Sequence, residues 1–598
     1  GAGRTGSAGG LMGVRRVAML AAAVFALHPL NTQTVTYISS RSAGLCTLFY
    51  LLTLELAVRG HLAWRRRKEP GRVGRVWGWG ALAALCLALG AMSKAIIITF
   101  PALLFLFHFY FLWAGSFRGW VRRCRLALLA VAAPLTGFIL VRFFSEGGIL
   151  PTGKTYLSTS TYLLTETFVI PFEYFRKMLF PINLSIEAPY PIVADWSDPF
   201  SYLGWAALAG YAAAICRLSR TQPYLGFGLA WMGITLLPTS SFVPLHDVAV
   251  EHRTYLPMVG LAVAVAAAVE WLIQALPARR APAGGPAPGK PAAGRVWALS
   301  GTALGLILLA LLLVDRNRVW KDEVSLWSDA VEKAPRLVRT YNNLGEAYDA
   351  LGQYAAAARQ FEAALRLNPN YTYALNNLGN VYGKQGRFAR AEAFFRKVIA
   401  REETYAPAHY NLGRALQALK RPQEALEHYA RAVELVPYFE QALYNYAFLA
   451  VQLGRPEEGT PYFRRFIAMQ PNRARGHFGL GTAFLAQGRF EDAEAAFREA
   501  ARVEPQYLPA FVNLAMAQLR SGRIDAAIAT FQDLLTRSPG IPGVHKNLGL
   551  IFAQHKSNPR QAIHHFRESL RLDPNQPEAA LLRGTIADLE RRLPLTGS

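Results

Sequence analysis

Residues 342–369 read NNLGEAYDALGQYAAAARQFEAALRLNP, and the same pattern returns every 34 residues along the rest of the chain. A proline closes almost every copy: Pro335, Pro369, Pro437, Pro471, Pro505 and Pro539. Glu403 takes the place of one proline, and Pro574 comes one residue late. A small residue recurs with the same spacing at Gly345, Gly379, Gly413, Ala447, Gly481, Ala515 and Gly549. The periodicity predicts an array of similar helical units.

A 34-residue period with a small residue in the first helix and a proline at the end is the signature of the tetratricopeptide repeat. We expect seven repeats over 337–575, each made of two antiparallel helices. A leading helix over 316–336 precedes them, and a C-terminal cap and tail over 576–598 follows. Helix pairs of this kind stack into a solenoid whose concave face can hold a peptide or a protein.

The first half of the chain has a different composition. Hydrophobic residues make up 52% of the 598 residues, and the excess lies before residue 315. The apolar segments of residues 1–315 therefore predict a polytopic helical membrane domain. With the helical repeats that follow, the expected fold class is all-α. The expected spans are nine, near 17–30, 42–58, 76–92, 95–113, 125–143, 199–216, 224–238, 254–275 and 297–314.

The net charge of +24 could indicate a nucleic-acid partner, but its placement favours another interpretation. Arg65, Arg66, Arg67 and Lys68 lie between two apolar segments, where basic residues set membrane topology. We therefore expect no nucleic-acid partner. The basic loops, with the flexible linker 276–296, are assigned to the cytoplasm. An odd number of spans then places the repeats on the other side, in the periplasm or in the lumen of the endoplasmic reticulum.

Four motifs precede the repeats in a fixed order: His28-Pro29-Leu30-Asn31 with Ser40-Arg41, Ala91-Met92-Ser93-Lys94, Leu237-Pro238-Thr239-Ser240-Ser241, and Glu251-His252-Arg253-Thr254-Tyr255-Leu256-Pro257. With the repeats, they resemble the transmembrane and tetratricopeptide-repeat O-mannosyltransferases. These are polyprenyl-phosphate-sugar-dependent glycosyltransferases of the GT-C fold. One departure is Ala95, because a glutamate commonly follows the Ser-Lys pair in such proteins.

The resemblance implies a membrane glycosyltransferase. It would move a sugar, mannose by resemblance, from a polyprenyl-phosphate donor to Ser or Thr hydroxyls of a protein. The repeats would hold that acceptor protein, and membrane lipids would surround the first domain. Such enzymes carry an acidic pair on a first external loop. That pair would lie upstream of Gly1, so the chain resembles an N-terminally truncated member and its catalytic residues are unknown.

Three basic residues are expected at the membrane surface opposite the cytoplasm, where the donor phosphate would lie: Arg253, Lys94 and Arg41. Arg253 is the first candidate, because a guanidinium binds phosphate through two hydrogen bonds. The alternative for Arg253 and Lys94 is that they extend to lipid headgroups. His28 is either a polar group at the mouth of the site or the end of a helix before Pro29.

Glu251 and His252 are further supporting polar residues. Together with His246 and Asp247 they form a cluster that either holds a divalent cation or is a solvated loop. The metal and any cofactor therefore remain open. In the long loop 144–198, the stretch 161–180 mixes aromatic and charged residues and could lie along the membrane interface as an amphipathic helix.

An asparagine occupies one position of the first helix in six of the seven repeats, while Gly479 takes that place in the seventh: Asn343, Asn377, Asn411, Asn445, Asn513 and Asn547. Amide side chains facing the concave groove could hold the backbone of an acceptor peptide. The row resembles the asparagine ladder of O-linked N-acetylglucosamine transferase. The alternative is that these amides bond within the solenoid.

Two functions of different classes follow from the sequence. The first is the glycosyltransferase, acting on proteins or, in a variant interpretation, on a glycan or lipid. The second is a non-catalytic membrane scaffold whose repeats recruit envelope or secreted proteins. The acidic pair separates them, because a scaffold has no need of it.

Overall fold

A computed structural model describes residues 8–31, 41–65, 72–93, 99–112, 119, 159–187, 191–236, 251–276 and 293–592. Every regular element in these ranges is a helix, in agreement with an all-α fold. The chain divides into two compact units, Gly1–Ala347 and Tyr348–Ser598. Each unit is described by itself.

Unit 1 contains helices of very different lengths. They are α1 (Ala8–Leu27), η1 (Pro29–Asn31), α3 (Arg41–Arg65), α4 (Arg72–Ser93), α5 (Phe100–Phe107), the π-helix η4 (His108–Leu112), α7 (Thr159–Val169), the π-helix η5 (Ile170–Phe175), α8 (Arg176–Leu179), α9 (Pro199–Thr221), α10 (Pro223–Leu236), η7 (Glu251–Thr254), α11 (Tyr255–Ala275), α12 (Ala293–Val319), α13 (Glu323–Lys333) and the first part of α14 (Val338–Ala350).

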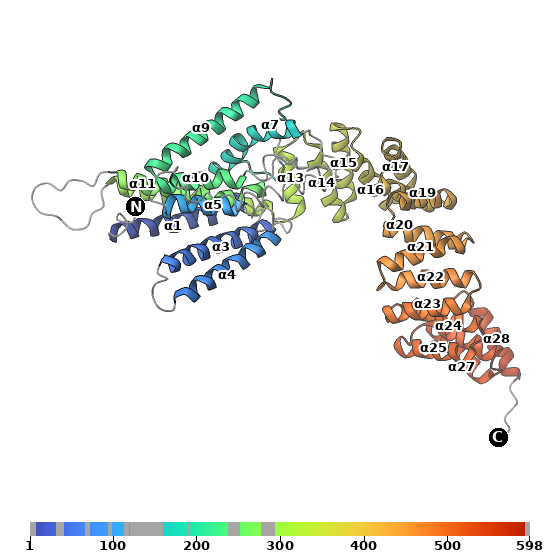
Figure 1. Ribbon diagram of the computed structural model, residues 1–598. Coiled ribbons are helices and arrows are strands. Elements are labelled where there is room, and N and C mark those ends of the chain that lie inside the picture. The colour runs from blue at the N-terminus through green and yellow to red at the C-terminus, as the bar shows by residue number, and fades with distance from the viewer. Residues whose placement is uncertain are drawn as a thin grey trace, which may run out of the picture. The chain divides into compact units, whose positions relative to one another are not determined.

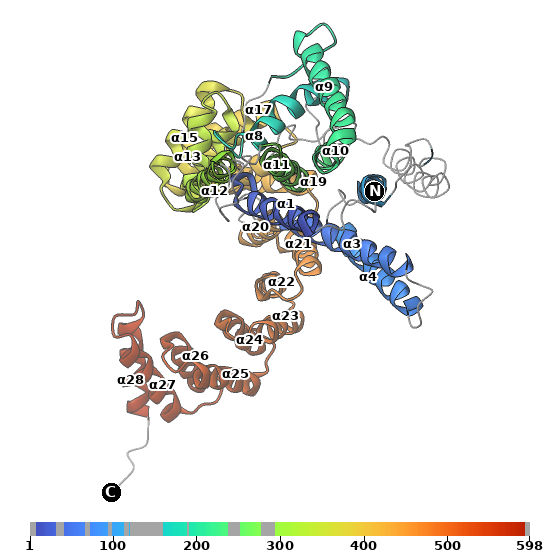
Figure 2. The same ribbon diagram turned by 90° about the vertical axis from the view of Figure 1, so that its left-hand side faces the viewer.

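The helix α11 lies at the centre of unit 1, where it packs against α1, α10 and α12 (Figures 1 and 2). Gly228 of α10 and Gly260 of α11 face each other so closely that a Cβ on either would collide with the backbone of the other helix. Small residues at such crossings are typical of helices that pack inside membranes. Helices α3 and α4 run side by side (Figure 1), and α3 also contacts α11.

Three helices in the described ranges are long and apolar enough to cross a membrane: Gly44–Trp64, Tyr255–Ala275 and Val296–Val319. Two shorter apolar helices, Trp77–Leu89 and Ala102–Phe111, fall below that length. The expected span 125–143 lies outside the described residues. The structure thus identifies three candidate spans, and the other expected spans stay predictions.

Residues 161–180 differ from the expected interfacial helix. The segment is divided among α7, η5 and α8, and Tyr162, Glu166 and Tyr174 are buried inside unit 1. A helix lying on a membrane surface would keep its charged side chains in water, and Glu166 is instead enclosed. The segment is therefore not a single amphipathic helix, and its place at the membrane interface stays a prediction. Asp198 caps the start of α9, because its Oδ1 accepts a hydrogen bond of 3.0 Å from the amide of Phe200.

Residues 338–572 contain the helices of seven repeats, and in each repeat the first helix has 13 residues and the second 14. In unit 2, α15 (Tyr354–Leu367) is followed by the helix pairs α16 (Thr372–Lys384) with α17 (Phe388–Arg401), α18 (Ala406–Ala418) with α19 (Pro422–Leu435), α20 (Glu440–Gln452) with α21 (Pro456–Met469), α22 (Ala474–Ala486) with α23 (Phe490–Val503), α24 (Leu508–Arg520) with α25 (Ile524–Arg537), and α26 (Pro542–Gln554) with α27 (Pro559–Leu572); α28 (Ala579–Arg592) comes last.

Within a pair, an aromatic ring of the second helix lies on the small residue of the first. A Cβ added to Gly379 would overlap the ring of Phe395, and one added to Gly413 would overlap Tyr429. Side chains at this ring position are buried in every pair: Phe361, Phe395, Tyr429, Phe463, Phe497, Phe531 and Phe566. The recurring glycine or alanine is therefore a consequence of close helix packing.

The turn between the two helices needs a residue with positive φ. Glycine provides it in five pairs, for example Gly386 at φ 75°, whereas Lys420 adopts φ 63° at the same place in the third pair. A residue with a Cβ is disfavoured in this left-handed conformation by about 1–2 kcal/mol.

Exchanging the two residue types should therefore have opposite effects on stability. We expect Lys420→Gly to raise the free energy of unfolding and Gly386→Lys to lower it, each by about 1 kcal/mol. No side chain lies within 4 Å of a Cβ built on Gly386, so its effect isolates the backbone. Far-UV circular dichroism of the full-length protein in detergent would measure both changes. Shifts of the same sign would contradict the conformational explanation.

Candidate functional site

The first helices of the repeats in unit 2 lie next to one another. Helix α16 contacts α18, α20 contacts α22, and α22 contacts α24. Because alternate helices touch only where the stack is tightest, the first helices line its inner face. Side chains on this face are the ones that could meet an extended ligand.

Two asparagines of the predicted row bond within the solenoid. Nδ2 of Asn411 donates to Oδ1 of Asn376 in the preceding repeat at 3.1 Å. Nδ2 of Asn445 donates to the hydroxyl of Tyr410, also in the preceding repeat, at 3.4 Å. Asn343 in unit 1 accepts a hydrogen bond from Asn342 at 3.3 Å. For Asn411 and Asn445 the structural role that the sequence left open is the one observed.

Asn513 and Asn547 differ from these two. Both are half-buried, on α24 and α26, and within the described ranges neither side chain has a hydrogen bond to another residue. Each amide therefore keeps its donors and its acceptor for a ligand. Asn377 is half-buried and has contacts of its own. The asparagines of the row thus differ in their hydrogen bonding, although each occupies the same position in its repeat.

The gap in the row has a steric cause. A Cβ at Gly479 would overlap the ring of Phe463, which belongs to the second helix of the preceding repeat. An asparagine at 479 would have to displace that buried ring, and overpacking of this kind costs about 1–3 kcal/mol. The glycine is thus required by packing.

In unit 1, Arg253 is buried and has a carboxylate partner that the sequence did not suggest. Nη1 lies 3.3 Å from Oε1 of Glu166, and the two side chains are 5% and 1% exposed. The residues are far apart in sequence, so only the fold brings them together. Arg253 as a ligand of the donor phosphate stays a prediction. In that role the guanidinium would have to give up its ion pair with Glu166 or bind Glu166 and the phosphate together.

The side chain of His28 is enclosed at the end of α1. Its Nε2 lies 2.9 Å from the carbonyl of Met178, and its Nδ1 accepts from the amide of Leu30 at 3.3 Å. Because a carbonyl only accepts, Nε2 carries the proton. Both ring nitrogens are used, and the bond from Nε2 connects the end of α1 to α8.

The remaining predicted residues of unit 1 are not brought to a described site. Lys94, His246 and Asp247 lie outside the described residues. Arg41 begins α3, and Glu251 and His252 begin η7, but their side chains are not described. Among the residues that the structure describes, no three His, Cys, Asp or Glu side chains form a metal site. The divalent cation therefore stays a prediction.

Unit 1 also contains a polar cavity of about 390 Å³. The segment 181–187, which forms part of its wall, is fixed because Arg316 and Lys333 both donate to the carbonyl of Leu184, at 2.8 and 2.7 Å. Three cations and two carboxylates line it, with one amide and one hydroxyl: Glu173, Arg176, Lys177, Asn183, Ser185, Glu187 and Lys333. Such a lining can bind a small anionic or polar group. The sequence singled out only the stretch that contains Glu173, Arg176 and Lys177.

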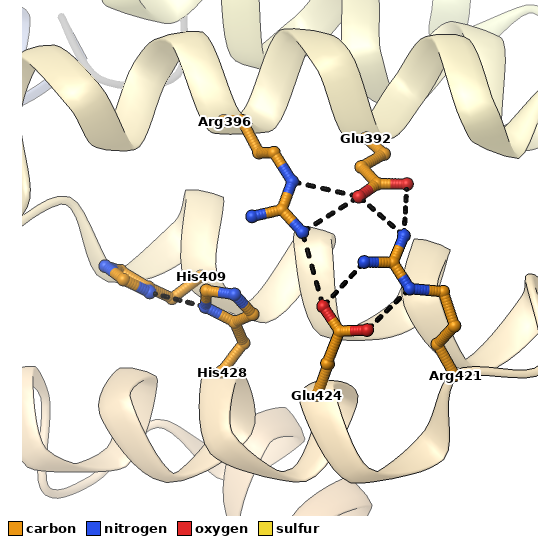
Figure 3. Close-up of polar contacts among 6 residues, drawn as sticks. All are labelled: Glu392, Arg396, His409, Arg421, Glu424 and His428. Carbon is orange, nitrogen blue, oxygen red and sulfur yellow. Dashed lines mark hydrogen bonds and ion pairs between the residues drawn. The ribbon is translucent and has the colours of Figure 1, made fainter.

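A polar network joins the second and third repeats (Figure 3). Arg421 lies between Glu392 and Glu424, with nitrogen–oxygen distances of 2.8 and 2.6 Å. Beside it, Nδ1 of His409 and Nδ1 of His428 are 3.1 Å apart, and Nε2 of His409 lies 2.9 Å from the carbonyl of Glu403.

The same histidine pair occurs in the last repeat, where Nδ1 of His545 and Nδ1 of His565 are also 3.1 Å apart. Burial, reinforced by the neighbouring His409 and Arg396, lowers the pKa of His428 to about 4. Burial also lowers the pKa of His565 to about 4. Each pair is therefore built for the neutral imidazole.

Models of the tetratricopeptide repeat family match residues 342–407 and 447–507, 406–439, and 484–544. These segments are tetratricopeptide repeats, as the sequence predicted, and repeats of this kind are suited to protein binding or scaffolding. The comparison with curated proteins gave no match.

Several solved structures are similar to the repeat part. YrrB, described as a TPR protein with an unusual peptide-binding site, is 22% identical, with a TM-score of 0.28 and coverage of 31% of this chain and 96% of YrrB. PilW, a type IV pilus biogenesis factor, is 22% identical, with a TM-score of 0.32 and coverage of 36% and 98%. A thermophilic TPR protein from Thermus thermophilus is 24% identical, with a TM-score of 0.25 and coverage of 31% and 100%.

The histidine pairs should make the repeats sensitive to acid. Between pH ~6.5 and ~4 the unfolded chain binds protons on these imidazoles while the folded chain does not, so stability falls as the pH falls. We expect the melting temperature to drop between pH 7 and 5, and the drop to be smaller in the His428→Gln/His565→Gln variant.

His477 provides the control. It occupies the position of His409 and His545, and its Nε2 contacts the carbonyl of Pro471 at 3.0 Å, but Ala496 stands where its imidazole partner would be. His477→Gln should leave the pH dependence unchanged. Equal pH profiles for the wild type and the double variant would show that the pairs do not control acid stability.

Proposed function

We propose that this protein is a membrane-attached repeat scaffold whose solenoid binds an extended polypeptide along its first helices. The observation that carries the proposal is the pair of half-buried amides, Asn513 and Asn547, that have no hydrogen bond within the described protein. A primary amide matches the donor and acceptor of a peptide unit, so it binds a backbone whatever its sequence. Repeated on successive first helices, it favours an extended chain.

The surroundings of these amides support the proposal. Half-buried Val512 and Met516 lie on the same helix as Asn513, and Leu550 on α26 is 37% exposed. A peptide placed there would cover apolar surface as well as form hydrogen bonds. Water exclusion around an amide pair strengthens its hydrogen bonds.

The proposed membrane attachment rests on α12. Its segment Val296–Val319 has a mean hydropathy of 2.3, and the most apolar stretch of that segment has no residue buried within the protein. Large apolar side chains such as Leu304 and Leu311 are more than half exposed. An apolar surface of this extent is unfavourable in water and is expected to be covered by lipid or by another protein. The segment Val296–Val319 is long enough to span a bilayer.

We further propose that the repeats are extracytoplasmic. The basic loops between the apolar segments support a cytoplasmic assignment for those loops, and the repeats follow the last apolar helix. The compartment would be the periplasm in a bacterium or the lumen of the endoplasmic reticulum in a eukaryote. Its protein partners would then be envelope or secreted proteins.

Removing the two amides should weaken peptide binding. The probe is a fluorescein-labelled, C-terminally amidated peptide of Gly, Ser, Phe and Gln, here called the neutral peptide. We expect Asn513→Ala/Asn547→Ala to lower the affinity of the full-length protein in detergent about 5- to 100-fold, since each lost hydrogen bond contributes about 0.5–1.5 kcal/mol. Fluorescence polarisation would measure the dissociation constants.

Asn411→Ala is the matched control, because its amide bonds to Asn376. It should lower the melting temperature and leave the affinity for the neutral peptide nearly unchanged. Equal affinities for the wild type and the double variant, or a loss caused only by Asn411→Ala, would contradict the proposed backbone binding.

A second candidate is the glycosyltransferase implied by the resemblance. It is supported by the polar cavity of unit 1, in which Arg176, Lys177 and Lys333 could neutralise a departing polyprenyl phosphate. In the transfer, an acceptor hydroxyl oxygen bonds to the sugar, its proton passes to a base, and the bond from the sugar to the phosphate breaks, which releases the polyprenyl phosphate. The matching family models lie in the repeats, so the scaffold is the leading proposal.

The second candidate predicts transfer of labelled mannose. Membranes containing the full-length protein would be given polyprenyl-phosphate mannose and a Ser/Thr-rich peptide. Arg176→Met, which removes one cavity cation, should lower the rate at least about tenfold, because such groups contribute several kcal/mol to charge stabilisation. The exposed Arg366→Met should have no effect. If wild-type protein that carries the acidic pair implied by the resemblance transfers no label, this candidate is wrong and the scaffold proposal is unaffected.

A further inference from the structure

Arg475 is the second residue of α22 and is half-buried between aromatic rings. Its guanidinium carbon lies 3.9 Å from the centre of the Tyr444 ring and 5.3 Å from that of Phe466. Stacking on an aromatic face holds the planar guanidinium in one orientation. Arg475 therefore presents a pre-positioned pair of donors at the junction of the fourth and fifth repeats.

This guanidinium lacks the partner that its setting calls for. Throughout the described part of the chain, no ion pair or hydrogen bond reaches the Arg475 side chain, and its Nε is buried without an acceptor. Arginines elsewhere in the solenoid, such as Arg421 and Arg455, are paired with glutamates. A partly desolvated cation without an acceptor is unfavourable, so a ligand that supplies one would be bound.

The position in the helix adds to this imbalance. Arg475 lies in the first turn of α22, where the helix dipole favours negative charge and disfavours a cation. Glu504 is close by, but its Oε1 accepts a hydrogen bond of 3.2 Å from the amide of Ala474 and it forms no ion pair with Arg475. An additional carboxylate would satisfy both the guanidinium and the helix end.

The same chain shows how this helix position takes a carboxylate. Arg339 is the second residue of α14, four repeats before Arg475, and in unit 1 it is ion-paired with Glu187. Glu187 lies in the non-helical segment 181–187, whose Leu184 carbonyl is held by Arg316 and Lys333. A non-helical stretch of polypeptide thus delivers an acidic side chain to the equivalent arginine.

We propose that Arg475 is the docking point for a carboxylate carried by an extended polypeptide, in the way that Arg339 receives Glu187. This inference rests on the proposed peptide-binding function and names the chemistry of the partner. Tyr444 and Phe448 stack beside the site, with ring centres 6.0 Å apart and planes at 10°. The residue next to the carboxylate is therefore apolar, and an aromatic residue fits best.

The test compares the neutral peptide with a form in which one Gln, flanked by Phe, is replaced by Glu. We expect the acidic peptide to bind the full-length protein in detergent at least tenfold more tightly. The difference should disappear in Arg475→Gln and shrink in Arg475→Lys, because an ammonium cannot make the forked contact. Arg473→Gln is the matched control, since Arg473 is an exposed residue of the same turn.

A third peptide distinguishes the source of the carboxylate. It is the neutral sequence with a free C-terminus, and an Arg475-dependent gain for this peptide alone would assign the site to chain ends. Equal affinity of all three peptides for the wild type would overturn the proposal and leave the backbone-binding function standing. If none of them binds, the proposed function itself fails and this inference fails with it. Melting temperatures of the variants would show that each is folded.

Discussion

The repeat array depends on one contact, in which a buried ring of the second helix lies on a glycine or alanine of the first. At Gly379 and Gly413 there is no room for a Cβ beneath Phe395 and Tyr429. This contact brings the two backbones close and fixes the rotation of the first helix about its axis. The direction of every other side chain on that helix is then fixed, because helix geometry sets its rotation relative to the glycine or alanine.

The consequences can be followed residue by residue. Two positions before the small residue stands the asparagine, which turns toward the preceding repeat, as Asn411 does. Four positions before it stands His409 or His545, each facing an imidazole of the second helix. Six positions before it stand Arg339 and Arg475, at the start of the helix. One steric constraint thus places three kinds of polar group in register.

The sequence was sufficient for the features that repeat. The 34-residue period predicted the helix pairs, because each small residue and ring recurs where packing requires it. It also predicted the asparagine row as a position. It could not predict that Asn411 and Asn445 would be bonded while Asn513 and Asn547 would not, because this depends on which side chain the preceding repeat offers.

The sequence was less informative about unit 1, where nothing repeats. Hydropathy suggested nine spans, and three helices among the described residues satisfy length and composition together. Arg253 was identified from its place before an apolar segment, but its partner Glu166 is 87 positions away in the chain. A pairing over that separation requires the tertiary fold. The polar cavity was missed for the same reason, since its wall combines α8, the segment 181–187 and α13.

In the proposed binding mode, the ligand would contact the few polar groups that remain unpaired in the described part of the solenoid. Most charged residues in contact across the second helices are already matched, as in the network of Arg421 with Glu392 and Glu424. Arg475 can remain unpaired without unfolding the repeat, because stacking on Tyr444 offsets part of the lost hydration by about 0.5–2 kcal/mol. The rings keep the guanidinium in place but provide no acceptor. A carboxylate would add that acceptor without disturbing the stack, which is why the aromatic cradle and the unpaired arginine are best understood as one site.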